Sequence, residues 1–387
     1  MVSNQADTAR LKPPTNLLRV AVVARREPGV TGTSRYAATL LRELPEAGVA
    51  AELACPEDPL VNALNGPGKH IGIDLERFFG QYPRRFPRRD VDVYHLATQT
   101  LATLLLRPHL DRPVVVTVHD IIPYLLRADT QFAAYGHAAH RAMDWLAMRG
   151  LTHADAIAAD SDWTRDTLLR ELSVPEHRVR TVRLGVDCDR FRPVTPDEHF
   201  WDRYGLAFGQ PFILYLGSED PRKNVASLVR AMAQIKDPEL LLVKAGPAHH
   251  LREHQSLLRL AQELGIAEKI RWVDHVPEDD LPAFYSAARM FVMPSIWEGF
   301  GLPVLEAMAC GTRVVCANSS SLPELAGADS IVCDPTPEGL ARAIEAGIRG
   351  EAQAGAAERL AWAGAFTWRK TAEGTAQLYR DTMDGKL

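Results

Sequence analysis

The segment LRVAVV at residues 18–23 is followed by a loop that contains Gly29, Gly32 and Thr33, and then by RYAATLLREL at residues 35–44. The first segment is a short apolar run, which is typical of a buried strand. The second places apolar residues at helical spacing, so it predicts an amphipathic helix. A strand, a loop and a helix in this order form the repeating unit of a parallel sheet.

The same alternation continues along the chain. Further strands are predicted at residues 91–96, 113–119, 154–159, 212–216, 240–245, 270–273, 290–293 and 314–316. Ser161 is expected to cap the helix SDWTRDTLLREL. The pattern breaks at GVDCDRFRPVTPDE, residues 185–198, where loop-forming and charged residues gather. We therefore expect an α/β fold of two doubly wound Rossmann-like domains, with ligands in a central cleft beyond the carboxyl ends of the strands.

The length also favours two domains, because 387 residues exceed one ordinary hydrophobic core. The predicted organisation has five parts: a disordered leader at 1–16, a first domain at 17–190, a linker at 191–210, a second domain at 211–365 and a last helix at 366–387.

Composition excludes several classes of protein. Hydrophobic residues make up 46% and charged residues 24% of the chain, as in soluble globular proteins. No uncharged apolar run approaches the ~20 residues of a membrane span, and the polar opening is unlike a secretory signal, so we expect a cytoplasmic protein. A net charge of −5 gives no general attraction to nucleic acid. The five cysteines form no CxxC pair and are interpreted as reduced packing residues: Cys55, Cys188, Cys310, Cys316 and Cys333.

The most informative motif is SIWEGFGLPVLEAMACG, residues 295–311, in which Glu298 and Glu306 flank a glycine-rich turn that leads into a helix. Free N–H groups at a helix start suit an anion, and carboxylates suit hydroxyl groups, so a nucleotide sugar fits both. A fully helical segment would separate the two carboxylates by ~12 Å, so they would contact different parts of one elongated ligand. The alternative is a helix cap whose acids only complement the helix dipole.

Arg222 and Lys223 directly follow the predicted strand FILYLG. At a strand end the two cations could clamp a diphosphate and offset the charge that builds on a departing phosphate. The alternative is an ordinary solvated loop.

His119 ends the apolar strand VVVTVHDIIP, where a side chain can reach an interdomain cleft. It could donate a hydrogen bond to a sugar hydroxyl or stabilise developing charge, and a buried histidine with satisfied hydrogen bonds is the competing interpretation. The loop at Gly32 could offer amides to a phosphate or an acceptor, although it lacks the full GxGxxG fingerprint.

No metal site is predicted. The acid pairs Asp90/Asp92 and Asp187/Asp189 do not lie beside the expected phosphates, where magnesium would need its carboxylates. The HExxH, GxSxG and GxxxxGK[ST] motifs are absent, which removes support for the obvious hydrolase and P-loop readings.

One basic segment has no role in this scheme. RFFGQYPRRFPRR, residues 77–89, holds five arginines among four aromatic residues. Two interpretations stay open, namely contact with anionic lipid or a phosphorylated acceptor, and a solvated loop with structural aromatic residues.

These motifs together resemble glycosyltransferase family 4, whose members are retaining, metal-independent enzymes with the GT-B fold. The resemblance spans nearly the whole chain and includes the Gly32 loop, VVVTVHDIIP, YLGSEDPRKN, SLPELAG and, most specifically, the Glu298 to Glu306 segment. It departs from many relatives at Ser218, where an Arg is common, and at Arg289, where an Asp is common.

The resemblance implies roles for the site residues. Glu298 would face the transferred sugar, Glu306 would bind the ribose hydroxyls, and Arg222 with Lys223 would hold the diphosphate. His119 would lie near the sugar from the first domain, which would bind the acceptor, and the last helix would cross back onto that domain. Backbone contacts complete the implied donor site: the amides of Phe300, Gly301 and Leu302 at the sugar hydroxyls, and residues near His275 and Val276 at the base.

The expected reaction is transfer of a hexosyl group from GDP-mannose or a UDP-hexose to a hydroxyl of a sugar, glycolipid or small molecule, with the anomeric configuration retained and without a cofactor. The absence of an obvious activated nucleophile fits a reaction that depends on positioning and charge stabilisation. The rival interpretations are a GT-B epimerase or phosphorylase, and a non-catalytic scaffold that binds nucleotide sugars.

Overall fold

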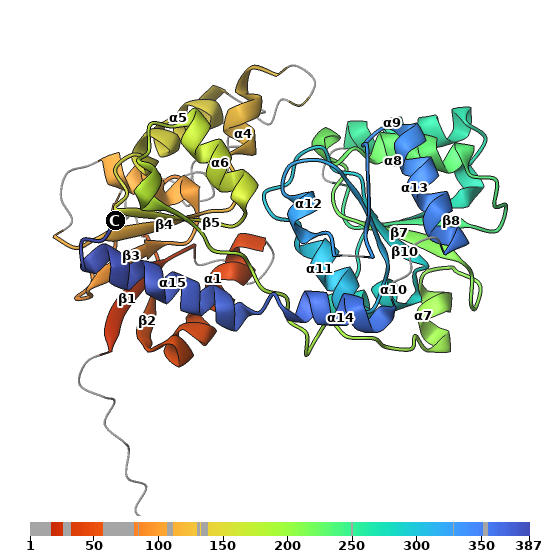
Figure 1. Ribbon diagram of the computed structural model, residues 1–387. Coiled ribbons are helices and arrows are strands. Elements are labelled where there is room, and N and C mark those ends of the chain that lie inside the picture. The colour runs from red at the N-terminus through yellow and green to blue at the C-terminus, as the bar shows by residue number, and fades with distance from the viewer. Residues whose placement is uncertain are drawn as a thin grey trace, which may run out of the picture.

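The computed structural model describes residues 17–25, 32–56, 81–83, 85–106, 111–129, 132, 138–248, 251–327, 329–350 and 355–387. Within these ranges the chain forms two six-stranded sheets in which every strand pair is parallel. Figure 1 shows the sheets side by side, each with helices on both faces. The expected α/β architecture of two Rossmann-like domains is confirmed.

The first sheet has the strand order β2-β1-β3-β4-β5-β6. Its strands are β1 (Leu18–Val23), β2 (Val49–Ala54), β3 (Val93–Leu96), β4 (Val114–Val118), β5 (Ala156–Ala159) and β6 (Val179–Thr181). The second sheet has the order β12-β11-β10-β7-β8-β9. Its strands are β7 (Phe212–Leu216), β8 (Leu241–Ala245), β9 (Ile270–Val273), β10 (Met290–Met293), β11 (Val314–Ala317) and β12 (Ile331–Cys333).

The helices that follow these strands are α1 (Gly32–Glu43), α4 (Ile122–Leu125), α5 (Ala138–Leu151), α6 (Asp162–Glu171), α7 (Glu198–Arg203), α8 (Val225–Gln234), α9 (Leu251–Glu263), α10 (Leu281–Ala287), α11 (Leu302–Ala309), α12 (Leu322–Leu325), α13 (Pro337–Arg349), α14 (Ala356–Gly364) and α15 (Trp368–Met383). Ser161 caps α6 as predicted, because its side chain accepts a hydrogen bond from the Thr164 amide. None of the helices in the described part of the chain has the length and apolarity needed to cross a bilayer.

Strands β2, β6 and β12 were not predicted. β2 and β12 are the outer strands of one edge of each sheet, and β6 is an edge strand of only three residues. A charged residue interrupts the apolar run in β2 (VAAELA) and in β6 (VRT), and β12 (IVC) is only three residues long, so none of the three gives a clear strand signal.

The predicted linker at 191–210 contains α7, which packs on the second domain. The Phe200 ring lies 4.8 Å from the ring of Phe284 on α10, in a T-shaped arrangement. Trp201 lies 6.3 Å from the ring of Phe212 on β7. The aromatic side chains of α7 bury apolar area in this way and tie most of the segment to the second sheet.

The C-terminal helix α15 returns to the first domain, where it contacts α1, β5 and the short helix η1 (Leu44–Ala47). The Tyr379 hydroxyl lies 2.5 Å from Nδ1 of His95 on β3. Burial lowers the pKa of His95 to about 3, so this ring is neutral and its second nitrogen pairs with Thr117. The first domain is therefore completed by the last segment of the chain.

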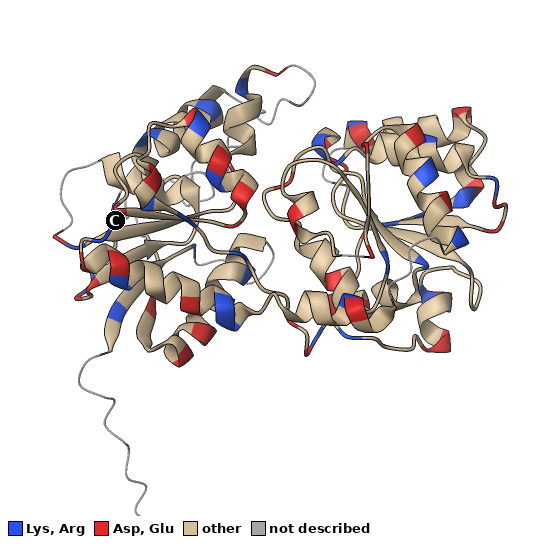
Figure 2. Cartoon of the chain, viewed as in Figure 1, with Lys and Arg blue, Asp and Glu red and all other residues tan. Residues whose placement is uncertain are grey.

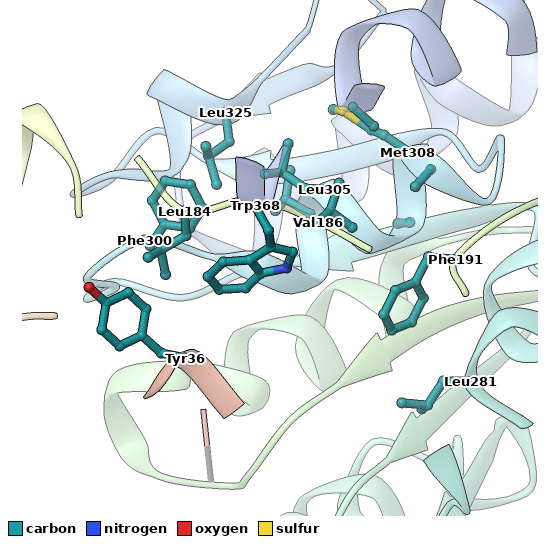
Figure 3. Close-up of a cluster of buried hydrophobic side chains, with 14 of the residues drawn as sticks. Tyr36, Leu184, Val186, Phe191, Leu281, Phe300, Leu305, Met308, Leu325 and Trp368 are labelled. Atoms are coloured by element: carbon teal, nitrogen blue, oxygen red, sulfur yellow. The ribbon is translucent and has the colours of Figure 1, made fainter. Parts of the chain in front are cut away.

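The two domains share one apolar cluster. Trp368, at the start of α15, packs among side chains from both domains, including Tyr36 of α1 and Phe300 and Leu325 of the second domain (Figure 3). Charged residues of both signs are interspersed over the helices (Figure 2). The shared cluster holds the carboxyl ends of the two sheets near one another, which is where the candidate site residues lie.

Candidate active site

The donor side of the site lies where the strand order of the second sheet reverses. From β7 the chain proceeds outward through β8 and β9, whereas from β10 it proceeds in the other direction through β11 and β12. The loops after β7 and β10 therefore emerge side by side at the carboxyl edge, which is the usual ligand position in such sheets. Arg222 and Lys223 lie on the first of these loops, and Glu298 lies on the second.

The loop after β7 is held in place by its own hydrogen bonds. Asn224 adopts a left-handed conformation with φ 59° and donates from its side-chain amide to the carbonyls of Pro294 (3.0 Å) and Pro335 (2.8 Å). The amide of Ile296 also donates to the Arg222 carbonyl at 2.9 Å. These bonds fix the short helix η5 (Pro221–Lys223), which carries both cations, against the loop after β10.

Glu298 is paired with the two cations. Its Oε1 lies 2.5 Å from Lys223 Nζ, and its Oε2 lies 4.0 Å from Arg222 Nη1, which also donates to the Trp297 carbonyl. Burial by itself raises the pKa of Glu298, but Lys223 and then Arg222 outweigh it, and the net pKa is below the ordinary value. Glu298 is therefore ionised at neutral pH. Sequence reasoning nominated all three residues, and the structure brings them together.

Two serines that sequence reasoning missed hold the backbone of this loop. Ser320 Oγ accepts from the Glu298 amide at 2.9 Å. Ser321 Oγ donates to the carbonyls of Glu298 (3.1 Å) and Phe300 (2.8 Å). Both belong to the SSSLPELAG segment, whose serine run was the available signal.

Glu306 lies on α11, and the residue that precedes this helix, Gly301, has φ 106°, a conformation that favours glycine. Its Oε2 accepts from the Tyr285 hydroxyl at 2.8 Å, and its Oε1 lies 3.5 Å from Arg35 Nη1 of the first domain. Burial raises the pKa of this carboxyl. Phe300 and Leu302 flank Gly301, so their amides lie at the N-terminal end of α11, and their contact with sugar hydroxyls stays a prediction.

A cavity of about 220 Å³ opens between the domains beside Glu306. Arg35 and Arg190 both contact Glu278 on its wall, at 2.6 and 2.7 Å. Glu278 belongs to the short helix η7 (Glu278–Asp280) after β9. Glu306 thus faces a polar space that residues of both domains line.

His119 is held by two hydrogen bonds from neighbouring loops of the first sheet. Its Nδ1 lies 2.6 Å from Asp160 Oδ2 after β5, and its Nε2 lies 3.0 Å from the Ala97 carbonyl after β3. A carbonyl and a carboxylate both accept, so the ring donates from both nitrogens and is protonated. Burial lowers the pKa of His119, but Asp160 outweighs it and the net pKa is raised. Both nitrogens are engaged within the protein, so the ring has charge, and no further N–H, to offer a ligand.

The His119 loop touches the Glu298 loop directly. A Cβ atom added to Gly299 would lie far inside van der Waals distance of the His119 carbonyl oxygen. The Gly299 carbonyl accepts from Ser161 Oγ at 2.7 Å and Thr164 Oγ1 at 3.2 Å, both on the first domain. His119 and Glu298 therefore lie on adjoining loops across the domain boundary, although they are 179 residues apart in sequence.

The remaining predicted donor residues lie farther from this centre. Gly32 starts α1, and Gly29 and the two residues after it lie outside the described residues. His275 and Val276 follow β9, which is separated from β7 by β8, so they lie at the outer part of the carboxyl edge. Their contact with a base stays a prediction.

The basic segment 77–89 is described only in part, because residues 77–80 and 84 lie outside the described residues. Tyr82 is buried, and the Phe86 ring packs at 4.6 Å on the ring of Tyr94. These two aromatic residues have structural contacts, and membrane contact by this segment stays a prediction. Among the described residues, no group of three or more His, Cys, Asp or Glu side chains is arranged to hold a metal ion.

Comparisons with known proteins show matches to glycosyltransferases over both domains. The family described as "Glycosyltransferase Family 4" matches residues 30–190, and "Glycosyl transferases group 1" matches residues 200–361. O-antigen chain mannosyltransferase B of Escherichia coli is 32% identical over 70% of this chain and 71% of its own length. D-inositol 3-phosphate glycosyltransferase 2 of Catenulispora acidiphila is 34% identical over 60% of this chain, but the alignment spans only 57% of that protein.

Solved structures show the same fold. Sucrose-phosphate synthase from Thermosynechococcus elongatus superposes with a TM-score of 0.72 at 22% identity, over 95% of this chain and 100% of that one. Anabaena HepE in complex with UDP and glucose gives a TM-score of 0.64 at 16% identity, over 93% and 98% of the two chains. The family matches to both domains and the 32% identical relative together show that the chain belongs to glycosyltransferase family 4 and is a hexosyltransferase with the GT-B fold.

Proposed function

We propose that this enzyme transfers a hexosyl group from a nucleotide diphosphate sugar to a hydroxyl of a sugar, glycolipid or small-molecule acceptor, with retention at the anomeric carbon and without a metal ion. The observation that carries the proposal is the contact of Lys223 with Glu298, with Arg222 alongside, at the point where the strand order reverses. A diphosphate and a sugar bound there would meet cations and a carboxylate at once.

The charges of the site residues indicate which part of the donor each residue would contact. Arg222 and Lys223 attract the diphosphate, and Glu298, being ionised, repels phosphate and accepts hydrogen bonds from sugar hydroxyls. Glu306 faces the interdomain cavity and is suited to the ribose hydroxyls. The donor would therefore extend from Glu298, past the cations, to the cavity at Glu306.

In the proposed step, the bond between the anomeric carbon and the phosphate oxygen breaks, and a bond to the acceptor oxygen forms on the same face of the sugar. The acceptor proton passes to the departing diphosphate. Arg222 and Lys223 stabilise the negative charge on that leaving group, and the cationic His119 adds positive charge from the first domain. No side chain is required as a nucleophile.

Mannose is the first candidate for the transferred sugar, because the relative that is 32% identical over most of both chains is a mannosyltransferase. The HepE structures contain UDP and UDP-glucose, so both GDP-mannose and UDP-hexoses belong in the test.

The test begins with melting temperatures in the presence of UDP, GDP, ADP and their hexose conjugates, with and without EDTA. A ligand that binds only the native state raises the melting temperature, so a selective, EDTA-insensitive shift identifies the donor base. The donor identified in this way then enters a turnover assay with an acceptor panel, in which the anomeric configuration of the product is determined. Formation of an epimer from donor alone, phosphorolysis of product, or loss of turnover with EDTA would contradict the proposal.

Glu298→Gln is expected to lower kcat by about a hundredfold or more, with little change in the dissociation constant of the donor, because it removes charge that acts on the transferred sugar. Glu263→Gln, at an exposed position at the end of α9, is the matched control and should leave both values unchanged. Equal rates for Glu298→Gln and wild type would remove Glu298 from the mechanism.

A further inference from the structure

A second cavity, of about 630 Å³, lies in the first domain between α4 and α5. Two aromatic residues, Tyr124 and Trp145, and two arginines, Arg127 and Arg141, line it together with three alanines. Among the described residues that line it, none is acidic. Small alanines leave space between the larger side chains, and the cavity thus combines flat apolar surfaces with uncompensated positive charge.

Arginine side chains lie over the two aromatic rings of the cavity. The guanidinium carbon of Arg127 lies 4.1 Å from the centre of the Tyr124 ring, and Arg127 Nη1 donates to the Tyr124 carbonyl at 2.7 Å. Arg149 lies 5.8 Å from the centre of the Trp145 ring, which is 49% exposed. The exposed ring of Trp145 offers a flat apolar surface to a ligand, and the arginines stacked on Tyr124 and Trp145 help to orient both rings.

The two arginines that line the cavity have no acidic partner. Within the described chain, neither Arg127 nor Arg141 has an ion pair with an acidic side chain, and the same holds for Arg149 beside Trp145. Guanidinium groups without an acidic partner, in a concave and partly apolar site, suit an oxyanion, and the planar fork of Arg fits the oxygens of a phosphate group.

The topology places this cavity toward the carboxyl edge of the first sheet, where His119 lies. α4 begins three residues after His119, at the carboxyl end of β4. α5 leads back to the start of β5, so its N-terminal part, with Arg141, lies toward the same carboxyl edge of the parallel sheet. A long acceptor with its reactive hydroxyl between His119 and Glu298 would therefore extend toward α4 and α5.

We propose that this cavity binds the phosphorylated part of the acceptor, with Arg127 and Arg141 on a phosphate or diphosphate and a sugar ring packed on Trp145 and Tyr124. The acceptor class is thus a phosphorylated glycan, whether free or linked to a lipid through its phosphate. This inference rests on the proposed transfer reaction, since it assigns the acceptor of the same site.

The test compares binding of mannose 6-phosphate and mannose to the full-length protein by ligand-detected NMR, in the absence of donor. The same titration on Lys223→Gln identifies any binding of the phosphate at the diphosphate clamp. Wild type is expected to bind mannose 6-phosphate at least about tenfold more tightly than mannose, with the Lys223→Gln protein showing the same preference, since a pair of charge-assisted hydrogen bonds separates the ligands.

Three variants isolate the cavity. The double variant Arg127→Gln/Arg141→Gln should lose the tenfold preference and keep its affinity for mannose, whereas Trp145→Ala should weaken both ligands equally. Arg180→Gln, an exposed arginine on β6 with no ion pair among the described residues, is the control and should bind as wild type. Melting temperatures with the donor nucleotide check that each variant keeps a folded donor site.

An unchanged preference in the double variant would overturn the inference. So would binding to phosphatidylglycerol vesicles, but not to phosphatidylcholine vesicles, that needs the same arginines while mannose 6-phosphate shows no advantage, because the cavity would then be a membrane-docking surface. Failure of the transfer reaction is distinguished by the nucleotide assay: if no nucleotide raises the melting temperature, the proposed function fails whatever the sugar phosphate does.

Discussion

At the scale of single residues, the His119 and Asp160 pair controls a charge beside the reaction centre. The pKa of His119 is raised above its ordinary value of about 6.5 because Asp160 outweighs the effect of burial. A raised pKa means that the stabilisation is complete below about pH 6.5 and is lost as the pH rises through the higher folded value. The pair should therefore contribute most in mildly acidic to neutral solution.

Asp160→Asn tests this directly. The difference in melting temperature between wild type and Asp160→Asn is expected to be largest near pH 6 and to shrink as the pH rises, since a neutral His119 no longer needs the carboxylate. The alkaline decline of kcat/KM should also move to lower pH, because the largest contribution that raises the pKa of His119 against burial is then lost, and only the weaker contributions of the Ala97 carbonyl and Asp120 remain. Asp202→Asn, exposed on α7, is the control. A difference that stays constant from pH 6 to pH 9 would contradict the ion pair.

At the scale of elements, the loop after β10 must pass against the loop after β4 without any side chain between them. Gly299→Ala is expected to lower kcat/KM by at least about tenfold, because a Cβ forces the two loops apart and displaces Glu298. Gly364→Ala at the end of α14, where a Cβ would meet nothing within 4 Å, is the matched control. Steady-state kinetics and far-UV circular dichroism separate lost positioning from lost folding, and full activity in Gly299→Ala would rule out the close contact.

At the scale of the whole molecule, hydrogen bonds connect the two domains beside the candidate active site. The Glu324 carboxylate of α12 accepts from the amides of Asp162 (2.9 Å) and Trp163 (2.7 Å) at the N-terminus of α6. An anion at a helix N-terminus is stabilised by the free N–H groups and the helix dipole, so this contact favours the closed arrangement. Ser161 and Thr164 reinforce it through the Gly299 carbonyl.

Glu324→Gln removes the charge of this interdomain contact. It is expected to shift the domains toward open arrangements and lower kcat/KM by about tenfold, since a hydrogen bond to a charged group contributes about 1.5–3 kcal/mol. Small-angle X-ray scattering should show a larger radius of gyration for Glu324→Gln than for wild type. The control is Glu338→Gln at an exposed position on α13, which should keep the radius of gyration of wild type. An unchanged radius together with unchanged kinetics would mean that Glu324 does not hold the domains closed.

Much of this molecule could be predicted from the sequence because the relevant physics is local. Continuous apolar runs identified β1, β7 and β10 with their observed bounds, since strands inside a parallel sheet are buried on both faces. The edge strand β9 was predicted with its observed bounds from a less regular pattern. The residues after those strands identified Arg222, Lys223 and Glu298, because parallel strands bring their carboxyl ends to one edge. The glycine turn before α11 could also be predicted from the sequence, because glycine residues favour the backbone conformation that such a turn needs.

What only the tertiary structure decided is every contact between distant segments. Asp160 lies 41 residues from His119, and Glu324 lies 162 residues from the Asp162 amide that it caps, so no spacing in the sequence relates either pair. The cavity between α4 and α5 likewise needs two helices to pack before its arginines and aromatic residues surround one space. The sequence by itself determined the central strands of both sheets and the candidate site residues Arg222, Lys223 and Glu298 that follow them, because local burial patterns encode the strands. The protonation of His119, the contacts between the domains and the cavity between α4 and α5 depend on side chains that become neighbours only after folding.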